Sequence, residues 1–411
     1  MPATPITDPR QLAVQCLWEV ARQGRLIPET MARIPCALSQ DDRALANELV
    51  YGSFRQLPGL EKNLATLCKP EKLPSKLRWL LIASLYQLGF MRVPAYAVVD
   101  EANRLAGLFK FPGLKPLVNG VLRNAARRGE DFWRAGDAAS RLLPDWLERL
   151  LTGQYGSQLV REWLADWERP GAVCYWQVEK RPGETDEVSP YLPHGLLREQ
   201  AFSQKDLASL GIYVQNHSSQ AVAELVCRSG SRTVLDLCAA PGGKACYMDA
   251  FGKDLAVTAW DAAPDRLARL RENRRRLGLD FEVLERPPEP DRHFDMVLVD
   301  APCSGIGIAA RHPEIKLLRK EPAGEDLRRI QRGVLDQGWA HVKPGGYLLF
   351  TVCSLDSREV PEPPADAVSA GKELGQWLPT GLPAVVEDNR FRISPAQGFD
   401  GFLGILIRKP G

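Results

Sequence analysis

The sequence predicts an all-helical N-terminal domain followed by an α/β domain with a doubly wound, mainly parallel sheet. Residues 1–135 show apolar side chains at helical spacing and no alternating strand pattern. From about residue 231, short apolar runs alternate with helix-length polar segments, which is typical of strand–helix–strand units. The length of 411 residues is the third observation, because it exceeds what one compact core usually organises and favours two or three domains.

The helical prediction for residues 1–135 rests on two segments. In "LRWLLIASLYQLGFM" a stripe of leucines returns every three or four residues, from Leu77 to Leu88. In "SQDDRALANELVYGSFR", Ser39 and the acids after it suit a helix N-terminus, so a small helical bundle is expected. Residues 136–230 are predicted to form a linker and small subdomain, because a helical piece over 146–167 gives way to a Pro/Gly-rich stretch.

The third predicted domain, residues 231–411, holds four apolar runs that indicate buried strands. They lie at 233–239, 255–261, 294–300 and 347–353. Between the second and third runs, Pro264 suits a first helical turn and Gly278 a helix C-terminus. In doubly wound sheets, ligands bind at the carboxyl ends of the strands, so the functional residues are expected there.

Charge and composition limit the partners. Residues 1–135 carry 19 Lys and Arg against 12 Asp and Glu, although the whole chain has a formal net charge of only +2. This local surplus fits either a phosphate-bearing partner or a solvated basic face. No apolar run approaches the length of a membrane span, and the N-terminus lacks the layout of a signal peptide, so a cytoplasmic protein is expected. Its nine cysteines are then reduced thiols, and the lack of CxxC pairs argues against a metal site.

A glycine-containing loop, "DLCAAPGGKA", follows the first predicted strand of this domain. Its glycines allow the backbone to approach a ligand closely, and it is neither GxGxxG nor a P-loop, which disfavours a nucleoside triphosphate. The next strand ends in an acid that can accept hydrogen bonds from ribose hydroxyls. These features predict a site for an adenosine-bearing cofactor, the alternative being a tight turn and a helix-capping acid. The candidate cofactor residues are Cys238, Ala239, Ala240, Pro241, Gly242, Gly243, Lys244 and Asp261.

Two further strands each deliver a cysteine at their C-terminal end. "VLVDAPCSGIG" contains Asp300 and Cys303, and "YLLFTVCSL" contains Cys353. Thiols placed there could act in covalent catalysis, although the residue types do not tell which one attacks. The alternative for a lone cytoplasmic cysteine is a small buried hydrophobe. That alternative is our interpretation of Cys16, Cys36, Cys68, Cys174, Cys227 and Cys246.

These motifs carry a family resemblance. "LDLCAAPGGKA", "DAPCSGIGIAARHPEIK", "KPGGYLLFTVCS" and "SREV" resemble the motifs of the RsmB (Fmu/Sun, NOL1/NOP2) family of RNA cytosine-5 methyltransferases. "DDRALANELVYGSFR", "LYQLGFMRVPAYAVVDEA" and "LVNGVLRNA" resemble the NusB-like helical RNA-binding domain. The resemblance implies a Rossmann-like catalytic domain, S-adenosylmethionine as methyl donor, and 16S ribosomal RNA or a small ribosomal subunit precursor as partner. We expect a monomer.

The resemblance also implies roles for the residues at the strand ends. C5 of cytosine is a weak nucleophile, and addition of a thiolate to C6 makes it reactive. The family assigns that attack to Cys353 and help with product release to Cys303. Asp300 would hold the base edge and lie near the methionine part of the cofactor, and Lys244 would order the site.

The segment "ARHPEIK" lies beside the active site in the family. Its Arg311, His312 and Lys316 would contact RNA phosphates, with a plain surface loop as the alternative. Two other hypotheses stay open for the whole chain: a catalytically inactive paralogue that binds RNA, and the same chemistry on another RNA such as tRNA. A DNA cytosine methyltransferase is disfavoured, because those enzymes resemble a "PCQ" pattern and this chain has "PCS".

Several positions depart from the family pattern. They concern the residue before the candidate nucleophile, the adenine-contacting acid and three short motifs: Val352, Glu285, Gln177–Glu179, Gln215–Asn216 and Arg358–Val360. We expect these departures to affect cofactor affinity and RNA contacts more than the chemistry, because both candidate thiols and the acids and lysine near them are present.

Overall fold

A computed structural model describes most of the chain, in which contacts define two compact units. The described residues are 5–134, 138–168, 172–178, 186–199, 202, 206–207, 211–319, 324–396 and 398–411. Unit 1 comprises Met1–Glu168 together with Ala309–Glu321, and unit 2 comprises Arg169–Ile308 together with Pro322–Gly411. The chain therefore passes between the units three times. The three-part division at 135/136 and 230/231 stays a prediction.

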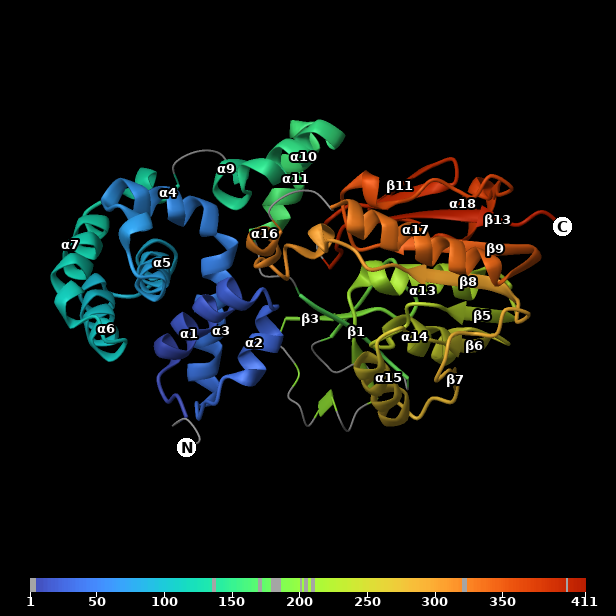
Figure 1. Cartoon of the computed structure of the whole chain (residues 1–411), viewed down its shortest axis with the longest axis horizontal. Helices are drawn as coiled ribbons and strands as arrows, with labels where there is room; N and C mark the ends of the chain where they lie inside the picture. The colour runs from blue at the N-terminus through green and yellow to red at the C-terminus, as the bar shows by residue number, and fades with distance from the viewer. Residues whose placement is uncertain are drawn as a thin grey trace. The chain divides into compact units, whose positions relative to one another are not determined.

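In the described residues of unit 1 the secondary structure is helical apart from one isolated bridge between Ile6 and Cys36, as the spacing of the apolar residues predicts (Figure 1). Its elements are α1 (Pro9–Gln23), α2 (Ile27–Arg33), α3 (Gln40–Arg55), α4 (Leu57–Leu67), η1 (Pro70–Lys72), α5 (Ser75–Phe90), α6 (Ala95–Leu108), η2 (Pro112–Leu114), α7 (Lys115–Ala126), α8 (Glu130–Trp133), α9 (Ala138–Leu142), α10 (Asp145–Tyr155), α11 (Ser157–Trp167) and α16 (Ile315–Leu318).

Local sequence explains where the helices of unit 1 begin. The Asp8 carboxylate accepts hydrogen bonds from the backbone N–H groups of Arg10 and Gln11, at 2.8 and 2.9 Å, and so caps α1. Ser39 caps α3 by accepting from the N–H of Asp42, at 3.1 Å, as the sequence predicts. Helix α5 supplies the centre of the core, because its leucines from Leu77 to Leu85 are at most 1% exposed.

Unit 2 contains two sheets and the helices that cover them. Its elements are β1 (Val173–Gln177), β2 (Glu187–Val188), β3 (Leu196–Arg198), β4 (Ile212–Val214), α13 (His217–Arg228), β5 (Thr233–Asp236), α14 (Gly243–Phe251), β6 (Ala256–Ala259), α15 (Pro264–Arg276), β7 (Glu282–Val283), β8 (Phe294–Asp300), η3 (Ile306–Ile308), α17 (Glu325–Ala340), β9 (Val342–Val352), η4 (Ser357–Glu359), β10 (Val368–Ser369), α18 (Gly371–Trp377), β11 (Ala384–Glu387), β12 (Arg390–Ile393) and β13 (Phe402–Arg408).

The main sheet of unit 2 is mixed. Its strands follow the order β11-β12-β13-β9-β8-β5-β6-β7, and β10 pairs with β13. The pairs among β5, β6, β7, β8 and β9 are parallel, whereas β10–β13 join by antiparallel pairing. The predicted α/β class is confirmed, but the antiparallel half did not follow from the sequence. A second, antiparallel sheet has the order β2-β3-β1-β4.

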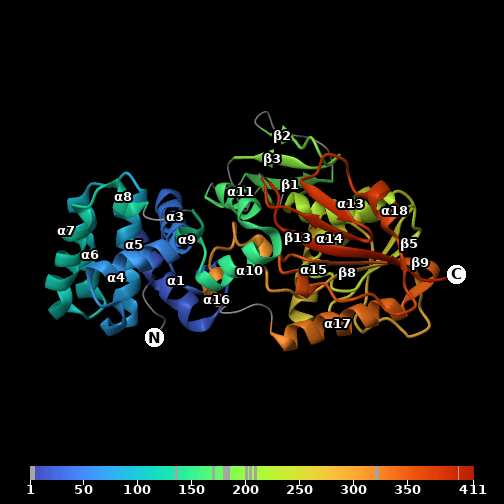
Figure 2. The same cartoon turned by 90° about the horizontal axis from the view of Figure 1, so that it is seen from above.

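Both faces of the main sheet are covered, as a parallel sheet requires. On β8, Met296 and Leu298 belong to a core with residues of α13, α14 and α15. The alternate residues Val297 and Val299 belong to a second core with Trp339 of α17. Figure 2 shows α17 along one side of the sheet. In the described part of the chain, none of the helices has the length and apolar character needed to cross a membrane.

Candidate active site

The predicted site residues of unit 2 gather at the carboxyl ends of β5, β6, β8 and β9. Strand β5 lies between β6 and β8. After β5 the chain continues to β6 and β7 on one side, and it then crosses to β8 on the other side of β5. Such a switch point leaves an opening outside the strand ends, where ligands of doubly wound sheets bind. The loop after β5 and the loop after β8 therefore border the same opening.

The glycine loop between β5 and α14 is held in place by Asp261. The Asp261 carboxylate is 4% exposed and accepts hydrogen bonds from the N–H of Ala240 at 3.1 Å and of Ala263 at 3.0 Å. Gly242 has a φ of 103°, and a Cβ there would lie 3.1 Å from Leu270 Cγ, so only glycine fits without strain. The loop is thus fixed close to the sheet, and the predicted contact of Asp261 with ribose stays a prediction.

Lys244 and Asp300 form an ion pair across the strand ends. Lys244 Nζ lies 2.5 Å from Asp300 Oδ2, and Thr351 Oγ1 donates to Asp300 Oδ1 at 3.2 Å. Burial alone would lower the pKa of Lys244, but the charge and hydrogen bond of Asp300 outweigh it and raise that pKa above its usual value. Lys244 is therefore a fixed positive charge beside Asp300.

Asp236, the last residue of β5, is a site residue that our choice of candidates missed. It is 1% exposed, and its carboxylate oxygens make no hydrogen bond of good geometry with the described residues, although the backbone of Cys238 interacts with the carboxylate and opposes the rise in pKa that burial causes. Burial raises the pKa of Asp236 to about 7. The positive charge of Lys244 opposes this rise, and the negative charges of Asp300 and Asp261 add to it. A buried carboxylate at a strand end fits a ligand with hydrogen-bond donors. The signal was present, since an acid ends the strand in "TVLD".

The two cysteines that follow strands β8 and β9 lie side by side. Cys303 Sγ and Cys353 Sγ are 2.6 Å apart, and both residues are partly exposed. The hydrogen bond with Cys353 and burial raise the pKa of Cys303 well above its ordinary value, and the charges of Cys353, Glu359 and Asp300 add to the effect. Cys303 therefore keeps its proton, and its S–H can point at the sulfur of Cys353.

Gly307 joins the two cysteine-bearing loops through its backbone. Its N–H donates to the carbonyl of Cys353 at 3.1 Å, and its carbonyl accepts from the N–H of Gly401 at 2.9 Å. A Cβ at position 307 would lie 1.9 Å from the Gly401 oxygen and 3.0 Å from the carbonyl carbon of Cys353. Backbone surrounds this position, so a side chain here must displace the loop that carries Cys353.

We expect Gly307→Ala to lower the free energy of unfolding by roughly 1–3 kcal/mol, because the added methyl group cannot be accommodated without moving backbone. Urea unfolding measures this effect. Gly333→Ala in α17 is the matched control, since nothing lies within 4 Å of its added Cβ, and we expect it to stabilise by up to about 1 kcal/mol. Equal stability of the two variants would contradict the close approach at Gly307.

Four of the residues in the segments that depart from the family pattern take ordinary structural positions. Val352 is fully buried in the core against α17. Glu285 is exposed and pairs with Arg271. Asn216 caps α13 by accepting from the N–H of Ser218 at 2.8 Å. Gln177 lies at the end of β1, and Glu179 lies outside the described residues.

The segment with the predicted RNA contacts belongs to unit 1. Arg311 is exposed, and His312 Nδ1 lies 3.3 Å from the buried Glu314 carboxylate. Lys316 is 6% exposed, and its Nζ donates to the carbonyls of Arg55 and Leu142 at 2.9 and 2.8 Å. Lys316 thus satisfies buried backbone of the helical unit, and its contact with an RNA phosphate stays a prediction. Arg311 and His312 stay predictions.

Burial lowers the pKa of Lys316 from 10.5 to about 7, with Arg55 adding to the effect and Glu314 opposing it. Between these values the unfolded chain binds more protons than the folded one, so stability rises with pH. We expect the free energy of unfolding of the wild type, relative to Lys316→Met, to increase from pH 7 to pH 9 by up to about 1.4 kcal/mol per pH unit. Urea unfolding at several pH values tests this, and a constant difference would contradict it.

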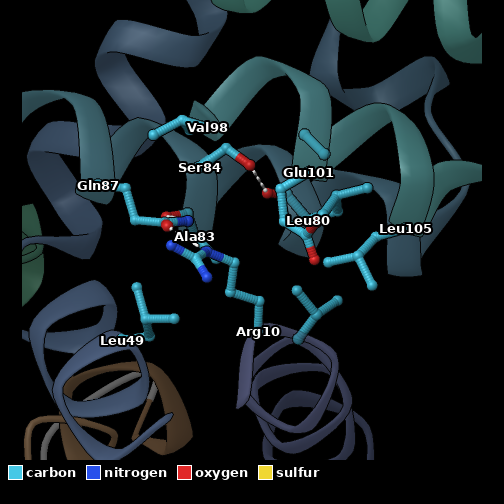
Figure 3. A pocket seen from close by; sticks show the side chains of 11 residues that line it. Arg10, Leu49, Leu80, Ala83, Ser84, Gln87, Val98, Glu101 and Leu105 are labelled. Atoms are coloured by element: carbon cyan, nitrogen blue, oxygen red, sulfur yellow. Dashed lines mark hydrogen bonds between the residues drawn. The ribbon is translucent and has the colours of Figure 1, made fainter. Parts of the chain in front are cut away.

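Unit 1 also contains a small pocket, which lies among α1, α3, α5 and α6 (Figure 3). Arg10 enters it and donates from Nε to Gln87 Oε1 at 2.8 Å, and the remaining walls are largely aliphatic. It holds none of the candidate site residues. The described parts of both units contain no cluster of three or more His, Cys, Asp or Glu suited to a metal ion.

The switch point between β5 and β8, the tight glycine loop and the acid after β6 are typical of a site for an adenosine-bearing cofactor in an α/β domain, and the class of that domain is an α/β methyltransferase. Comparison with protein families supports this class. Residues 225–372 match the model for the 16S rRNA methyltransferase RsmB/F, and residues 7–127 match the NusB family.

Relatives extend the match to nearly the whole chain. Ribosomal RNA small subunit methyltransferase B of Shewanella oneidensis is 32% identical, over 97% of this chain and 99% of its own. The protein of the same name from Serratia proteamaculans is 33% identical, over 88% and 89%. The chain therefore belongs to the ribosomal RNA small subunit methyltransferase B family, which consists of S-adenosylmethionine-dependent methyltransferases.

Solved structures share the fold. The crystal structure of PH0851 superimposes with a TM-score of 0.75 and 19% identity, covering 99% of this chain and all of that one. NSun6 from Pyrococcus horikoshii with SFG has a TM-score of 0.50 and 16% identity, covering 65% of this chain and 98% of that chain. The prediction of a NusB-like helical domain followed by a Rossmann-like methyltransferase domain is thus confirmed.

Proposed function

We propose that this chain methylates C5 of a cytosine in 16S ribosomal RNA, through a covalent bond between Cys353 and C6 of the base. The observation that carries the proposal is the pair of thiols 2.6 Å apart, beside the ion pair of Lys244 and Asp300. A methyltransferase that acts on oxygen or nitrogen has no use for a nucleophilic thiol, whereas a carbon acceptor must first be activated.

The residues at the strand ends fit S-adenosylmethionine. The glycine loop from Cys238 to Gly243 packs closely on α15, since a Cβ at Gly242 would lie 3.1 Å from Leu270 Cγ, and this holds the loop at the strand ends. Asp236 offers a buried carboxylate to a donor such as an ammonium group, and Asp261 stands at the strand end that suits a ribose. When bound, the cofactor supplies an electrophilic methyl group on a positively charged sulfur.

The chain's own residues account for the other steps. The Cys353 thiolate adds to C6, forming a C–S bond and shifting electrons toward C5, which then takes the methyl group. Afterwards a base, for which a water molecule suffices, takes the proton from C5; the C–H electrons re-form the C5–C6 double bond, and the C6–S bond breaks to release the Cys353 thiolate. Cys303, adjacent to Cys353, assists this elimination. Asp300, charged and ordered by Lys244, holds the base edge.

The substrate assignment rests on the relatives and on the helical domain. The relatives are named for methylation of small-subunit ribosomal RNA, and residues 7–127 match the NusB family. Residues 1–135 also carry the basic surplus that a phosphate backbone favours. The same chemistry on tRNA, and an inactive RNA-binding paralogue, are the competing functions.

Methyl transfer from labelled S-adenosylmethionine to purified 16S ribosomal RNA, small subunits and tRNA separates these functions. We expect label in the small-subunit RNA alone, and 5-methylcytosine that is absent from cells lacking the gene. Label in tRNA alone would favour the other substrate. Failure to bind the cofactor in calorimetry, with RNA binding intact, would identify a paralogue without catalytic activity.

A further inference from the structure

A fully buried carboxylate lies behind the two cysteines. Glu359 ends the short helix η4 and is 0% exposed. Its Oε1 accepts hydrogen bonds from the hydroxyls of Ser304 and Ser354, both at 2.5 Å. Its Oε2 accepts from the N–H of Ser304 at 2.8 Å and from Gln331 Nε2 at 3.0 Å. Four donors therefore converge on one side chain.

The serines that Glu359 binds are the residues immediately after the two cysteines. Ser304 follows Cys303 in the loop after β8, and Ser354 follows Cys353 after β9. Their hydroxyl oxygens lie 3.1 Å apart, and each also accepts a backbone N–H of its own loop. Gln331 Nε2 donates to the carbonyl of Pro302 as well, at 3.0 Å, which fixes the Cys303 loop from its other side.

Regular pairing of the strands ends before the cysteines. The last paired residues of β8 and β9 are Asp300 and Thr351, followed by one hydrogen bond from the N–H of Ala301 to Thr351. Beyond these residues, where the chain leaves the sheet after β8 and β9, the Glu359 carboxylate binds Ser304 of one loop and Ser354 of the other. It thus continues the connection between β8 and β9 up to the two thiols.

We propose that Glu359 is a positioning residue that holds the two cysteine loops together and sets the distance between the Cys303 and Cys353 sulfurs. Its acceptors match four donors, and hydrogen bonds to a carboxylate are stronger than those between neutral groups. The effect on methyl transfer rests on the function proposed above, because orientation errors of about 1 Å can cost roughly 100-fold in rate. The effect on sulfur spacing does not depend on that function.

The spacing can be measured with phenylarsine oxide, a trivalent arsenical that forms two As–S bonds with a close pair of thiols and releases one water. We expect the wild type to capture it, and Cys303→Ala or Cys353→Ala to lose the capture. Glu359→Ala should weaken capture at least tenfold and reduce the kcat of methyl transfer more than it changes KM. Glu362→Ala is the matched control. Glu362 lies three residues after Glu359, but it is exposed and pairs with Arg390 instead of the cysteine loops.

Glu359→Gln separates positioning from charge. Its amide keeps an oxygen for the N–H of Ser304 and for Gln331, while its NH₂ can donate to the serine hydroxyls. We therefore expect arsenical capture within threefold of the wild type. The negative charge near Cys303 is lost, so the limb of the pH–rate profile that depends on Cys303 should move to lower pH.

A Ser304→Ala/Ser354→Ala double variant carries the same test if Glu359→Ala does not fold, since it removes both hydroxyl contacts and leaves the carboxylate. Arsenical capture equal to that of the wild type, in folded Glu359→Ala or in the folded double serine variant, would overturn the proposal. Loss of methyl transfer in those variants with normal capture would also overturn it. If the wild type transfers no methyl group to any RNA but capture still depends on Glu359, the proposed function fails and the positioning role stands.

Discussion

Cys353→Ala is expected to abolish methylation of 16S ribosomal RNA, with a fall in rate of at least about 10³-fold, as found when a nucleophile is removed. Without the thiol, no bond to C6 forms and C5 stays unreactive toward the methyl donor. Incorporation of labelled methyl groups measures the loss. Cofactor binding should persist, because the glycine loop and Asp261 are on other strands.

The control for this variant is Cys227→Ala. Cys227 is a partly buried cysteine of α13, and burial raises its pKa to about 12, so it is not placed to act as a nucleophile. We expect this variant to keep its activity. Methylation that survives in Cys353→Ala would remove Cys353 from the role of nucleophile and leave Cys303 as the candidate.

Cys303→Ala is expected to accumulate a covalent complex between protein and RNA. The attack on C6 and the methyl transfer need only the Cys353 thiol, whereas the release step loses the assistance of Cys303. A band of lower mobility on a denaturing gel should appear when both cofactor and RNA are present. A single round of methylation should persist while turnover falls by roughly 10²-fold or more, in the range of a lost acid–base group.

The double variant Cys303→Ala/Cys353→Ala is the matched control, because it lacks the thiol that forms the adduct. It should give no shifted band. A normal turnover rate without any adduct in Cys303→Ala would show that Cys303 has no part in release.

The sequence predicts the parts of the fold that depend on local pattern. The apolar runs at 233–239, 294–300 and 347–353 overlap β5, β8 and β9, and the strand ends bring Lys244, Asp300 and both cysteines together. Apolar runs and glycine-containing loops are each a few residues long, so they can be recognised in a single sequence. The same holds for the Ser39 cap.

The features that could not be predicted depend on partners far apart in the chain. Ser304 and Glu359 are 55 residues apart, and neither residue type alone indicates a buried contact. The antiparallel strands β11 and β12 have four residues each, which is too short for a local pattern to identify them, and β11 is apolar in sequence yet largely exposed. The two carbonyls that accept from Lys316 belong to residues that lie 261 and 174 positions away, so no local pattern indicates these contacts.

The segment 309–321 has a consequence for how the protein is made. It completes the helical unit, because Glu314 accepts the N–H of Ile27, Lys316 binds the carbonyls of Arg55 and Leu142, and Leu317 and Leu318 pack on the helical core. During translation, residues 1–168 leave the ribosome well before this segment. The helical unit therefore lacks these native contacts until about 150 further residues have been synthesised. A fragment cut at residue 168 remains in that unfinished state permanently.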